Sequence, residues 1–291
     1  MNLLPGWLRR HVAALRALLV LTAVLGVLYP LAVTAVAQVP GLKDNADGSY
    51  VSAGGRRVGS ELIGQSFTDK EGNPLRQYFQ SRPSAAGDAG YDPTATSASN
   101  LGPEDVVDKD GEPSLLSTVC ARGKAVGELE GVDGSRPYCT EGGAGAVLSV
   151  LGPRDGAGAV VHPTRVISVN EPCPAVPFID RYRGVKVECA APGRDPGAGR
   201  IVPIRGSAPE KPAVPADAVT AGGSGLDPHI SVAYADLQVR RVAQARGLPA
   251  GRVGELVRDA TTGRALGFMG QPAVNVLRLN IALDKAAPYR G

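Results

Sequence analysis

The feature that most constrains this chain is an uncharged apolar run from Ala17 to Val39. Its 23 residues suffice for a transmembrane helix, because about 20 apolar residues in helical form cross the hydrocarbon core of a bilayer. Residues 1–16 contain three arginines and no acidic residue, and positive charge beside a span stays on the cytoplasmic side. We therefore expect a basic cytoplasmic N-terminus at 1–16, a single transmembrane helix at 17–39 and an extracytoplasmic remainder.

The alternative to an anchor is a cleaved signal peptide, because Ala35-Val36-Ala37 has the form of a cleavage site. The apolar run is longer than the roughly 7–15 residues of a signal-peptide core. This length favours the anchor. Both interpretations place residues 40–291 outside the cytoplasm.

The four cysteines agree with an oxidising compartment. They are Cys120, Cys139, Cys173 and Cys189. Four thiols can form two disulfides in three different pairings, and all three stay open at this point. A zinc site is the other interpretation, but such sites usually contain close ligand pairs, and the chain has no C-x-x-C motif. We expect disulfides and no metal.

The charge balance indicates the kind of partner. The formal net charge is +3, and the three N-terminal arginines account for it, so residues 40–291 are formally neutral. A nucleic-acid-binding domain would need a basic surface. We expect the lipid bilayer as a partner and no nucleic acid.

Residues 40–132 are interpreted as the first part of the extracytoplasmic domain. Asp47-Gly48 is typical of a hairpin turn. Residues 78–103 are rich in Gly, Ser, Pro and Asn and read as a long loop, which is usually either functional or disordered. The spacing of apolar residues over 114–132 predicts a helix with Ser114 as its N-cap.

Residues 133–212 differ in composition from the residues before them. They are rich in glycine and proline and contain three of the four cysteines. Short β-type runs occur at 146–151, 165–169 and 184–190. This pattern predicts a β-rich insertion that carries disulfides.

Residues 213–291 form the second part of the domain. Their pattern predicts an amphipathic helix over 231–247, with Gly247 as C-cap and with Arg240, Arg241 and Arg246 pointing away from the core. A second helix can begin at Pro249. Residues 273–285 alternate like a strand with one buried face, and a short terminal helix is the competing interpretation.

The fold class that follows is one N-terminal transmembrane α-helix and then an α/β (α+β) extracytoplasmic domain with a β-rich, disulfide-bearing insertion. Motifs that identify enzymes are missing: the chain has no G-x-S-x-G, no P-loop and no H-E-x-x-H. We therefore expect no catalytic residue.

The stretch GGSGLDPHIS, residues 222–231, has two main interpretations. As an anion cradle it would use free N–H groups at a helix N-terminus. As a structural turn it would place Asp227 or Ser231 as the cap of the next helix, with Pro228 near its first turn. The structural interpretation is favoured, because no lysine stands in the loop to complete a phosphate site. A hydrolase built from Ser224, Asp227 and His229 is disfavoured, because catalytic triads come from distant segments.

Five ordered stretches carry a resemblance to a known family. They are GSELIGQSF, YFQSRPSAAGDAGYDPTATSASNLGP, SGLDPHIS, VRRVAQARG and GQPAVNVLRLNIALDK. With the single N-terminal span, the chain resembles the C subunit of the bacterial Kdp-type potassium-transporting P-type ATPase. The resemblance covers roughly residues 10–120 and 212–286, and the insertion lies outside it.

The resemblance implies a non-catalytic subunit of an ATP-driven potassium importer in the bacterial cell membrane. Its expected partners are a potassium-channel-like subunit and an ATP-hydrolysing P-type subunit, so that ATP and K⁺ are handled by the complex and no cofactor is bound firmly here. The family's C subunit is needed for assembly and is described as a catalytic chaperone that raises ATP affinity. An anchored extracellular binding module without a transport role is the alternative function.

The resemblance also selects site residues. The motif linked to nucleotide response, or to structure alone, comprises Ser224, Gly225, Leu226, Asp227, Pro228 and Ile230. Candidate subunit contacts are Arg82, Pro83, Ser84, Asn100, Gln271, Pro272, Asn275 and Asn280. Because the predicted topology puts the motif outside and ATP is inside, an indirect effect on ATP affinity is expected.

Overall fold

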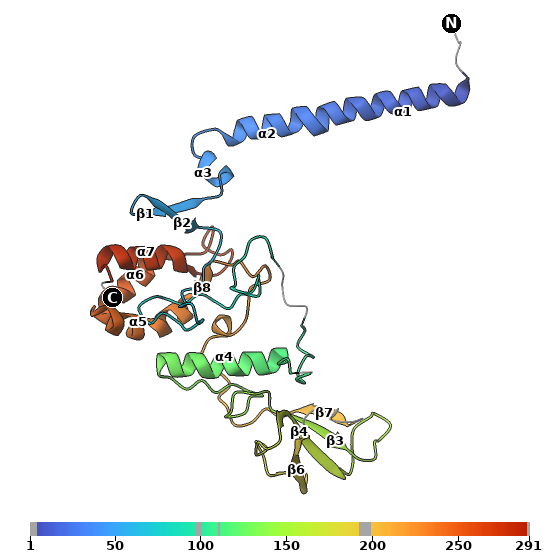
Figure 1. Cartoon of the computed structure of the whole chain (residues 1–291), viewed down its shortest axis with the longest axis vertical. Helices are drawn as coiled ribbons and strands as arrows, with labels where there is room; N and C mark the ends of the chain where they lie inside the picture. Colours follow the sequence, from blue (N-terminus) through green and yellow to red (C-terminus); the bar gives the residue numbers. More distant parts are fainter. Residues whose placement is uncertain (1–4, 97–100, 110, 192–198, 290–291) are drawn as a thin grey trace. The chain divides into compact units, whose positions relative to one another are not determined.

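The computed structural model describes residues 5–96, 101–109, 111–191 and 199–289. The chain divides into two compact units, one ending at Leu62 and one beginning at Ile63. Figure 1 shows both units, coloured from the N-terminus to the C-terminus.

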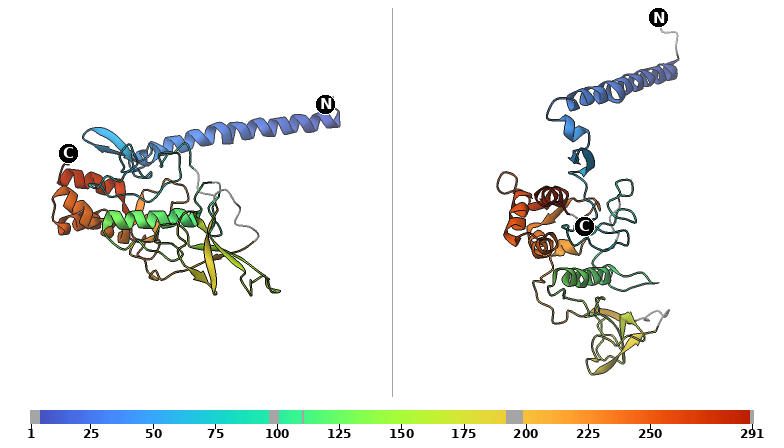
Figure 2. Two further views of the ribbon diagram at one scale, coloured as in Figure 1. Left: turned by 60° about the horizontal axis from the view of Figure 1, so that its bottom comes forward. Right: turned by 60° about the vertical axis from the view of Figure 1, so that its left-hand side comes forward.

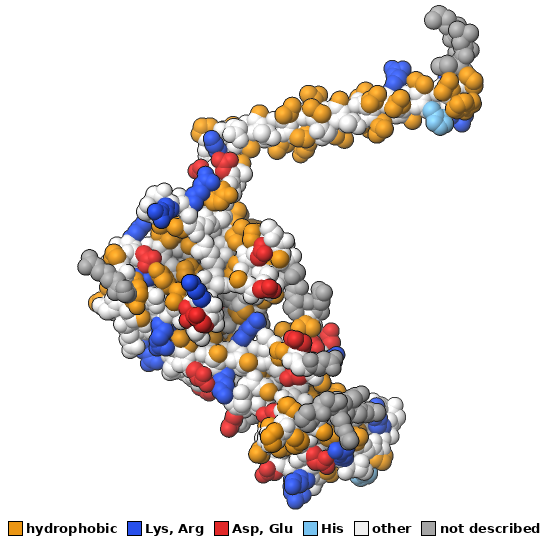
Figure 3. All heavy atoms as spheres, viewed as in Figure 1, with side chains coloured by type: hydrophobic (Ala, Val, Ile, Leu, Met, Phe, Trp, Pro, Cys, Tyr) orange, Lys and Arg blue, Asp and Glu red, His pale blue; other side chains and the backbone are white. Residues whose placement is uncertain are grey.

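The first unit begins with a continuous apolar helix made of α1 (Gly6–Ala23), the π-helical segment η1 (Val24–Leu28) and α2 (Tyr29–Ala37). This helix of 32 residues is long and apolar enough to cross a membrane, and no part of its most apolar stretch is buried within the protein. Hydrophobic side chains cover much of its visible surface in Figure 3. An apolar helix is thus present where the transmembrane helix was predicted, and it extends further toward the N-terminus than residue 17.

A short helix and a hairpin complete the first unit: α3 (Lys43–Ala46), β1 (Tyr50–Ala53) and β2 (Arg56–Ser60), with β1 and β2 antiparallel. The predicted hairpin turn at Asp47-Gly48 is wrong, because those residues end α3. The turn is Gly54-Gly55, where φ is +57° and +77°. Two successive positive φ angles are what a tight hairpin turn requires, and glycine adopts them without steric cost.

In the second unit, helix α4 (Leu115–Glu130) confirms the helix predicted over 114–132. The Ser114 hydroxyl oxygen accepts a hydrogen bond from the Ser117 N–H, and Gly131 ends the helix in the left-handed conformation. These are the cap positions that the side chains favour.

The insertion is a sheet in the order β5-β6-β4-β3-β7. Its strands are β3 (Val147–Leu151), β4 (Arg165–Pro172), β5 (Arg181–Tyr182), β6 (Val185–Ala190) and β7 (Arg200–Pro203). β4 and β6 are parallel, and the other neighbours are antiparallel. Leu148, Val150, Val160, Val166 and Val187 form its small apolar core.

The disulfides join Cys120 to Cys139 and Cys173 to Cys189. The structure thereby selects one of the three open pairings. The first bond ties α4 to the start of the insertion, and the second ties the end of β4 to β6. In Figures 1 and 2 the sheet lies beside α4.

The C-terminal part follows the 3₁₀ turn η2 (Ala216–Ala218). It contains β8 (His229–Ser231), α5 (Val232–Arg246), α6 (Ala250–Asp259), β9 (Thr261–Thr262), β10 (Ala273–Asn275) and α7 (Val276–Ala286). β10 lies between β8 and β9 in a small antiparallel sheet. The predicted helices from 231 and from Pro249 are confirmed, with Gly247 as the left-handed C-cap of α5.

The strand predicted over 273–285 is wrong beyond Asn275. The Asn275 side chain accepts a hydrogen bond from the Arg278 N–H and starts α7. Val276, Leu279 and Leu283 are buried at a helical spacing of three and four residues. The alternation that suggested a strand is also present, but the helical set is the one that faces the core.

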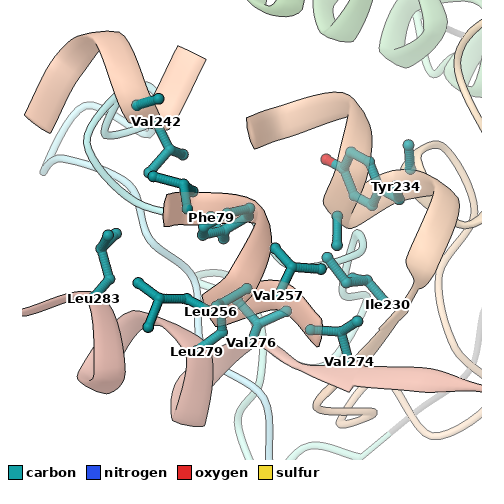
Figure 4. Packing of buried hydrophobic residues seen from close by; sticks show 14 of the residues in the cluster. Phe79, Ile230, Tyr234, Val242, Leu256, Val257, Val274, Val276, Leu279 and Leu283 are labelled. Atoms are coloured by element: carbon teal, nitrogen blue, oxygen red, sulfur yellow. The ribbon is translucent and has the colours of Figure 1, made fainter. Parts of the chain in front are cut away.

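The main core lies among α5, α6, α7 and the segment through Phe79. Figure 4 shows the Phe79 ring among Val242, Leu256, Leu279 and neighbouring side chains. Phe79 is fully buried, although its segment belongs to no helix or strand. Side-chain contacts must therefore hold this segment in place.

Candidate functional site

Two of the predicted groups of residues, one near Arg82 and one in the loop 222–231, meet in a single junction. Gly225 lies at φ +70° against Ala86, and a Cβ on it would stand 2.9 Å from the Ala86 Cβ and 3.0 Å from the Ala86 nitrogen. Only glycine fits both this backbone conformation and this close approach. The glycine of SGLDPHIS therefore lets the loop pack against the segment that follows Arg82.

The Arg82 guanidinium contacts Asp227 in the loop and the two residues that directly precede the loop. Its NH1 nitrogen lies 2.8 Å from Asp227 Oδ2, and its Nε and NH2 donate to the Thr220 carbonyl oxygen at 3.3 Å. NH2 also donates to the Ala221 carbonyl at 3.3 Å. Among the contacts described, Arg82 is the cation that faces this loop. Its charge is neutralised by Asp227, which belongs to the loop itself.

Ser84 fixes the other side of the junction. Its hydroxyl donates to the Gly225 carbonyl at 2.6 Å and accepts hydrogen bonds from the N–H groups of Ala86 and Tyr91, at 3.1 and 2.8 Å. The Tyr91 hydroxyl donates to the Arg82 carbonyl at 2.7 Å. Burial raises the pKa of Tyr91 to about 12, so this phenol stays protonated as a donor at neutral pH.

The loop's own polar groups are also used internally. The Leu226 N–H donates to Ser224 Oγ at 3.1 Å, and the His229 N–H donates to Asp227 Oδ1 at 3.0 Å. His229 Nδ1 lies 3.3 Å from the same oxygen, Asp227 Oδ1. Ser224 thus hydrogen-bonds within its own turn, while His229 pairs with Asp227.

The structure corrects part of the structural interpretation of the loop. Asp227 and Pro228 do not begin a helix, because strand β8 comes between them and α5. Pro228 and Ile230 are buried, and the Pro228 carbonyl accepts a hydrogen bond from Val276. Ser231, the other predicted cap, does accept a hydrogen bond from the Tyr234 N–H at 3.1 Å and caps α5.

A second set of contacts holds the extended segment 76–82, which we call the clamped segment. The Gln238 side chain accepts from the Gln80 N–H at 2.7 Å and donates to the Gln80 carbonyl at 3.1 Å. The Asn280 side chain does the same for Phe79, at 2.9 and 3.0 Å. The two amides, from α5 and α7, satisfy backbone groups that a neighbouring strand would otherwise satisfy.

Arginines from α5 complete the clamp. Arg241 Nε pairs with Glu130 Oε1 at 2.9 Å, and NH1 donates to the carbonyls of Arg76 and Tyr78 at 2.6 and 2.9 Å. Arg246 donates to the Gln77 carbonyl and pairs with Asp284 at 2.7 Å. The prediction that these two arginines point away from the core is wrong: their side chains are 2% and 1% exposed.

Glu130 is the acidic partner in this buried network, and its side chain is fully enclosed. Burial raises the pKa of Glu130, and the adjacent Arg241 guanidinium opposes that rise. The pairing with Arg241 offsets part of the cost of burying this carboxyl group. Sequence reasoning missed this network because a charged residue between apolar positions of an amphipathic helix normally faces solvent.

The remaining candidate contact residues lie in different environments. Gln271 and Pro272 are exposed, whereas Asn275 and Asn280 are buried and take part in the hydrogen bonds given above. Pro83 is half-buried beside Arg82. Asn100 lies outside the described residues. A role of these residues in contacts with other subunits stays a prediction.

Within the part of the chain that the structure describes, no group of three or more His, Cys, Asp or Glu side chains is arranged to hold a metal ion.

Comparison with known proteins shows the family. The model of the family "K+-transporting ATPase, c chain" (KdpC) matches residues 11–127 and 199–285. Both the junction and the clamped segment lie in the matched ranges, and most of the insertion does not.

Individual relatives match over nearly their whole length. The "Potassium-transporting ATPase KdpC subunit" of Kineococcus radiotolerans is 39% identical over 285 residues, which is 98% of each chain. The proteins of the same name from Streptomyces coelicolor and Mycobacterium tuberculosis are 39% and 35% identical, covering 97% and 95% of this chain and 96% and 98% of their own. Because these alignments leave out so little of either chain, these relatives align with most of the insertion. The chain belongs to the KdpC family, the c chain of the K⁺-transporting ATPase.

Proposed function

We propose that this chain is a non-catalytic subunit that stabilises the assembled potassium importer and raises the ATP affinity of its ATP-hydrolysing subunit without contacting ATP. The observation that carries the proposal is the pairing of Arg82 with Asp227 and with the Thr220 and Ala221 carbonyls that directly precede the loop. A phosphate would have to displace the loop's own carboxylate to reach this cation.

The backbone donors of the loop support the same conclusion. Anion sites use free N–H groups at a loop and helix N-terminus. Here the N–H groups of Gly225, Leu226 and His229 donate within the loop, and Ser231 accepts from the first turn of α5. These contacts support a structural role for the motif as a brace, by which we mean that it joins the residues that follow the clamped segment to the small sheet containing β8.

The proposed topology leads to an indirect mechanism. Three arginines lie in the N-terminal part of α1, before the uncharged run 17–39, and they favour a cytoplasmic N-terminus, which leaves residues 40–291 on the opposite side from ATP. The subunit would then act by binding one conformation of its partners, a channel-like and a P-type subunit, more tightly than another. Such coupling is reciprocal, so ATP should tighten the association of this chain by the same factor by which the chain tightens ATP binding.

The test measures both affinities in the purified complex. We expect ATP, or a non-hydrolysable analogue, to slow the dissociation of this chain, and we expect the chain without partners to bind no nucleotide. Photolabelling of residues 222–231 by an ATP analogue, or a reporter at the C-terminus that responds on the cytoplasmic side, would contradict the proposal.

A single substitution separates the brace from an anion cradle. Asp227→Ala releases Arg82, so a phosphate site should gain affinity, whereas a brace should lose stability. We expect the second result, seen as weaker assembly and no gain in nucleotide binding. Asp236→Ala, at an exposed position of α5, is the matched control that should change neither.

A further inference from the structure

The loop between β9 and β10 ends in a tight turn with apolar side chains on its outside. Ala265 and Met269 pair across the turn, since the N–H of each donates to the carbonyl of the other at 2.9 Å. The Phe268 N–H also donates to the Ala265 carbonyl at 3.3 Å. The Arg264 guanidinium fastens the base of the loop by donating to the Gly270 carbonyl at 2.8 Å. The turn is therefore well defined in shape.

We call Leu266, Phe268 and Met269 the apolar tip. Their exposed fractions are 82%, 72% and 53%, and they belong to neither apolar core of the described chain. Single exposed apolar residues are ordinary, but adjacent large ones on a projecting turn mark an interaction surface.

The backbone of the tip adds a second, independent observation. Leu266 has φ +53° and Gly267 has φ +81°, so both central residues of the turn are left-handed. Asn and Gly are the usual residues in such turns, and a leucine there is disfavoured because its Cβ crowds the following carbonyl oxygen. Leu266 buries almost no surface to offset this cost within the chain. The leucine side chain is held outward at an energetic cost, as expected where a partner uses it.

The family match makes another subunit of the ATPase the partner to test. The tip lies within the matched range 199–285, together with the junction, and this chain is a subunit of a multi-subunit ATPase. The tip itself carries no charge, so its complement is apolar, and a rigid turn loses little entropy when it docks into a formed pocket. Gln271 and Pro272, which follow it, are exposed as well and can extend the contact.

We propose that the apolar tip inserts into an apolar pocket on another protein subunit of the K⁺-transporting ATPase and anchors this chain in the complex. The inference rests on the proposed assembly role but not on the proposed effect on ATP affinity.

The test uses the full-length chain expressed with its partner subunits. Phe268→Ser and Leu266→Asn each remove an apolar anchor, and Asn suits the left-handed backbone, so the fold should be kept. Anchors of this kind often cost 2 kcal/mol or more when truncated, so we expect the association constant to fall by roughly 30-fold or more for Phe268→Ser. The matched control is Val176→Ser, which is 80% exposed but lies in the insertion between the ranges of the family match. It should leave association unchanged.

A photo-crosslinking side chain placed at position 268 identifies the occupant directly. A crosslink to another Kdp subunit supports the proposal. A crosslink only to lipid, a crosslink only to a second copy of this chain, or unchanged association of both tip variants would overturn it. The assembly role itself is tested by deleting the whole chain: if deletion weakens the complex and the tip variants do not, only the proposal about the tip fails.

Discussion

The clamped segment and the sheet of the insertion are held by different kinds of interaction, although both belong to the second unit. Backbone groups of the clamped segment are satisfied by side chains of Gln238, Arg241 and Asn280, which are about 158 to 201 residues away in the sequence. Strands of the insertion satisfy one another by backbone pairing, and a disulfide closes a separation of 16 residues.

This difference predicts how each region responds to substitution. In the clamped segment each polar side chain is needed individually, because its loss leaves buried backbone groups without a partner. In the insertion the ladder hydrogen bonds do not depend on side-chain identity, so only changes of volume or of a crosslink matter. The predictions below test this contrast, beginning with the largest expected effect.

Arg241→Met should cause the largest loss of stability. It removes the partner of the fully enclosed Glu130 and the donor to two carbonyls of the clamped segment. Breaking a buried pair from one side costs about 3–5 kcal/mol. Urea unfolding of the full chain in detergent, followed by circular dichroism, measures it. Arg252→Met is the control, since its pair with Glu255 is half-exposed and should be worth less than about 1 kcal/mol. Equal effects of the two substitutions would remove the contrast between the regions.

Replacing Cys173 and Cys189 by serine should destabilise the insertion by about 3 kcal/mol, the value for closing a loop of this length. Limited proteolysis should then cut within residues 133–212, while association with the partner subunits stays at the level of the unmodified chain. Loss of association would mean that the insertion and the part of the chain matched by the family model form one functional unit.

Gln238→Leu keeps the side-chain volume and removes both hydrogen bonds to Gln80. The N–H and carbonyl of Gln80 then stay buried without these partners, at about 1–3 kcal/mol. The same urea titration measures the loss, and Leu237→Ala on the same helix distinguishes a packing effect from a hydrogen-bond effect. A neutral result would show that the Gln238 side chain is not needed individually and that the other contacts are sufficient to hold the clamped segment.

The contrast also explains which parts of the structure were predictable. Local signals were sufficient for α4, α5 and α6, because Ser114, Ser231, Gly247 and Pro249 are caps whose chemistry acts within one turn. Strands β3, β4 and β6 of the insertion followed from short β-branched runs for the same reason, whereas β5 and β7 were not predicted. The hairpin turn was misplaced because Asp47-Gly48 and Gly54-Gly55 carry similar signals.

The clamp and the disulfide pairing could not be predicted in this way. Nothing near Gln238 or Arg241 in the sequence indicates that they face Gln80 and Glu130, since these contacts exist only after the chain has folded. At the junction, the glycine-rich loop was visible, but its partner Ser84 was only suggested by resemblance. The α7 region failed because its leucines satisfy two periods at once, and the cap at Asn275 decides between them.

The smallest effect concerns two helix caps that lie outside both regions, at the starts of α5 and α4. Ser231→Ala removes the acceptor for the Tyr234 N–H at the start of α5, and Ser114→Ala does the same for Ser117 at the start of α4. Each should cost about 1 kcal/mol in urea unfolding of the full chain. Ser231 also donates to Asp217 at 2.9 Å and Ser114 donates to Asp108 at 2.7 Å, so the two positions are closely matched. Ser66→Ala, at an exposed hydroxyl, serves as the control near zero. If Ser231→Ala costs several kcal/mol more than Ser114→Ala, the cap of α5 must also hold the junction in place. The dependence on single polar side chains would then extend from the clamped segment to the start of α5.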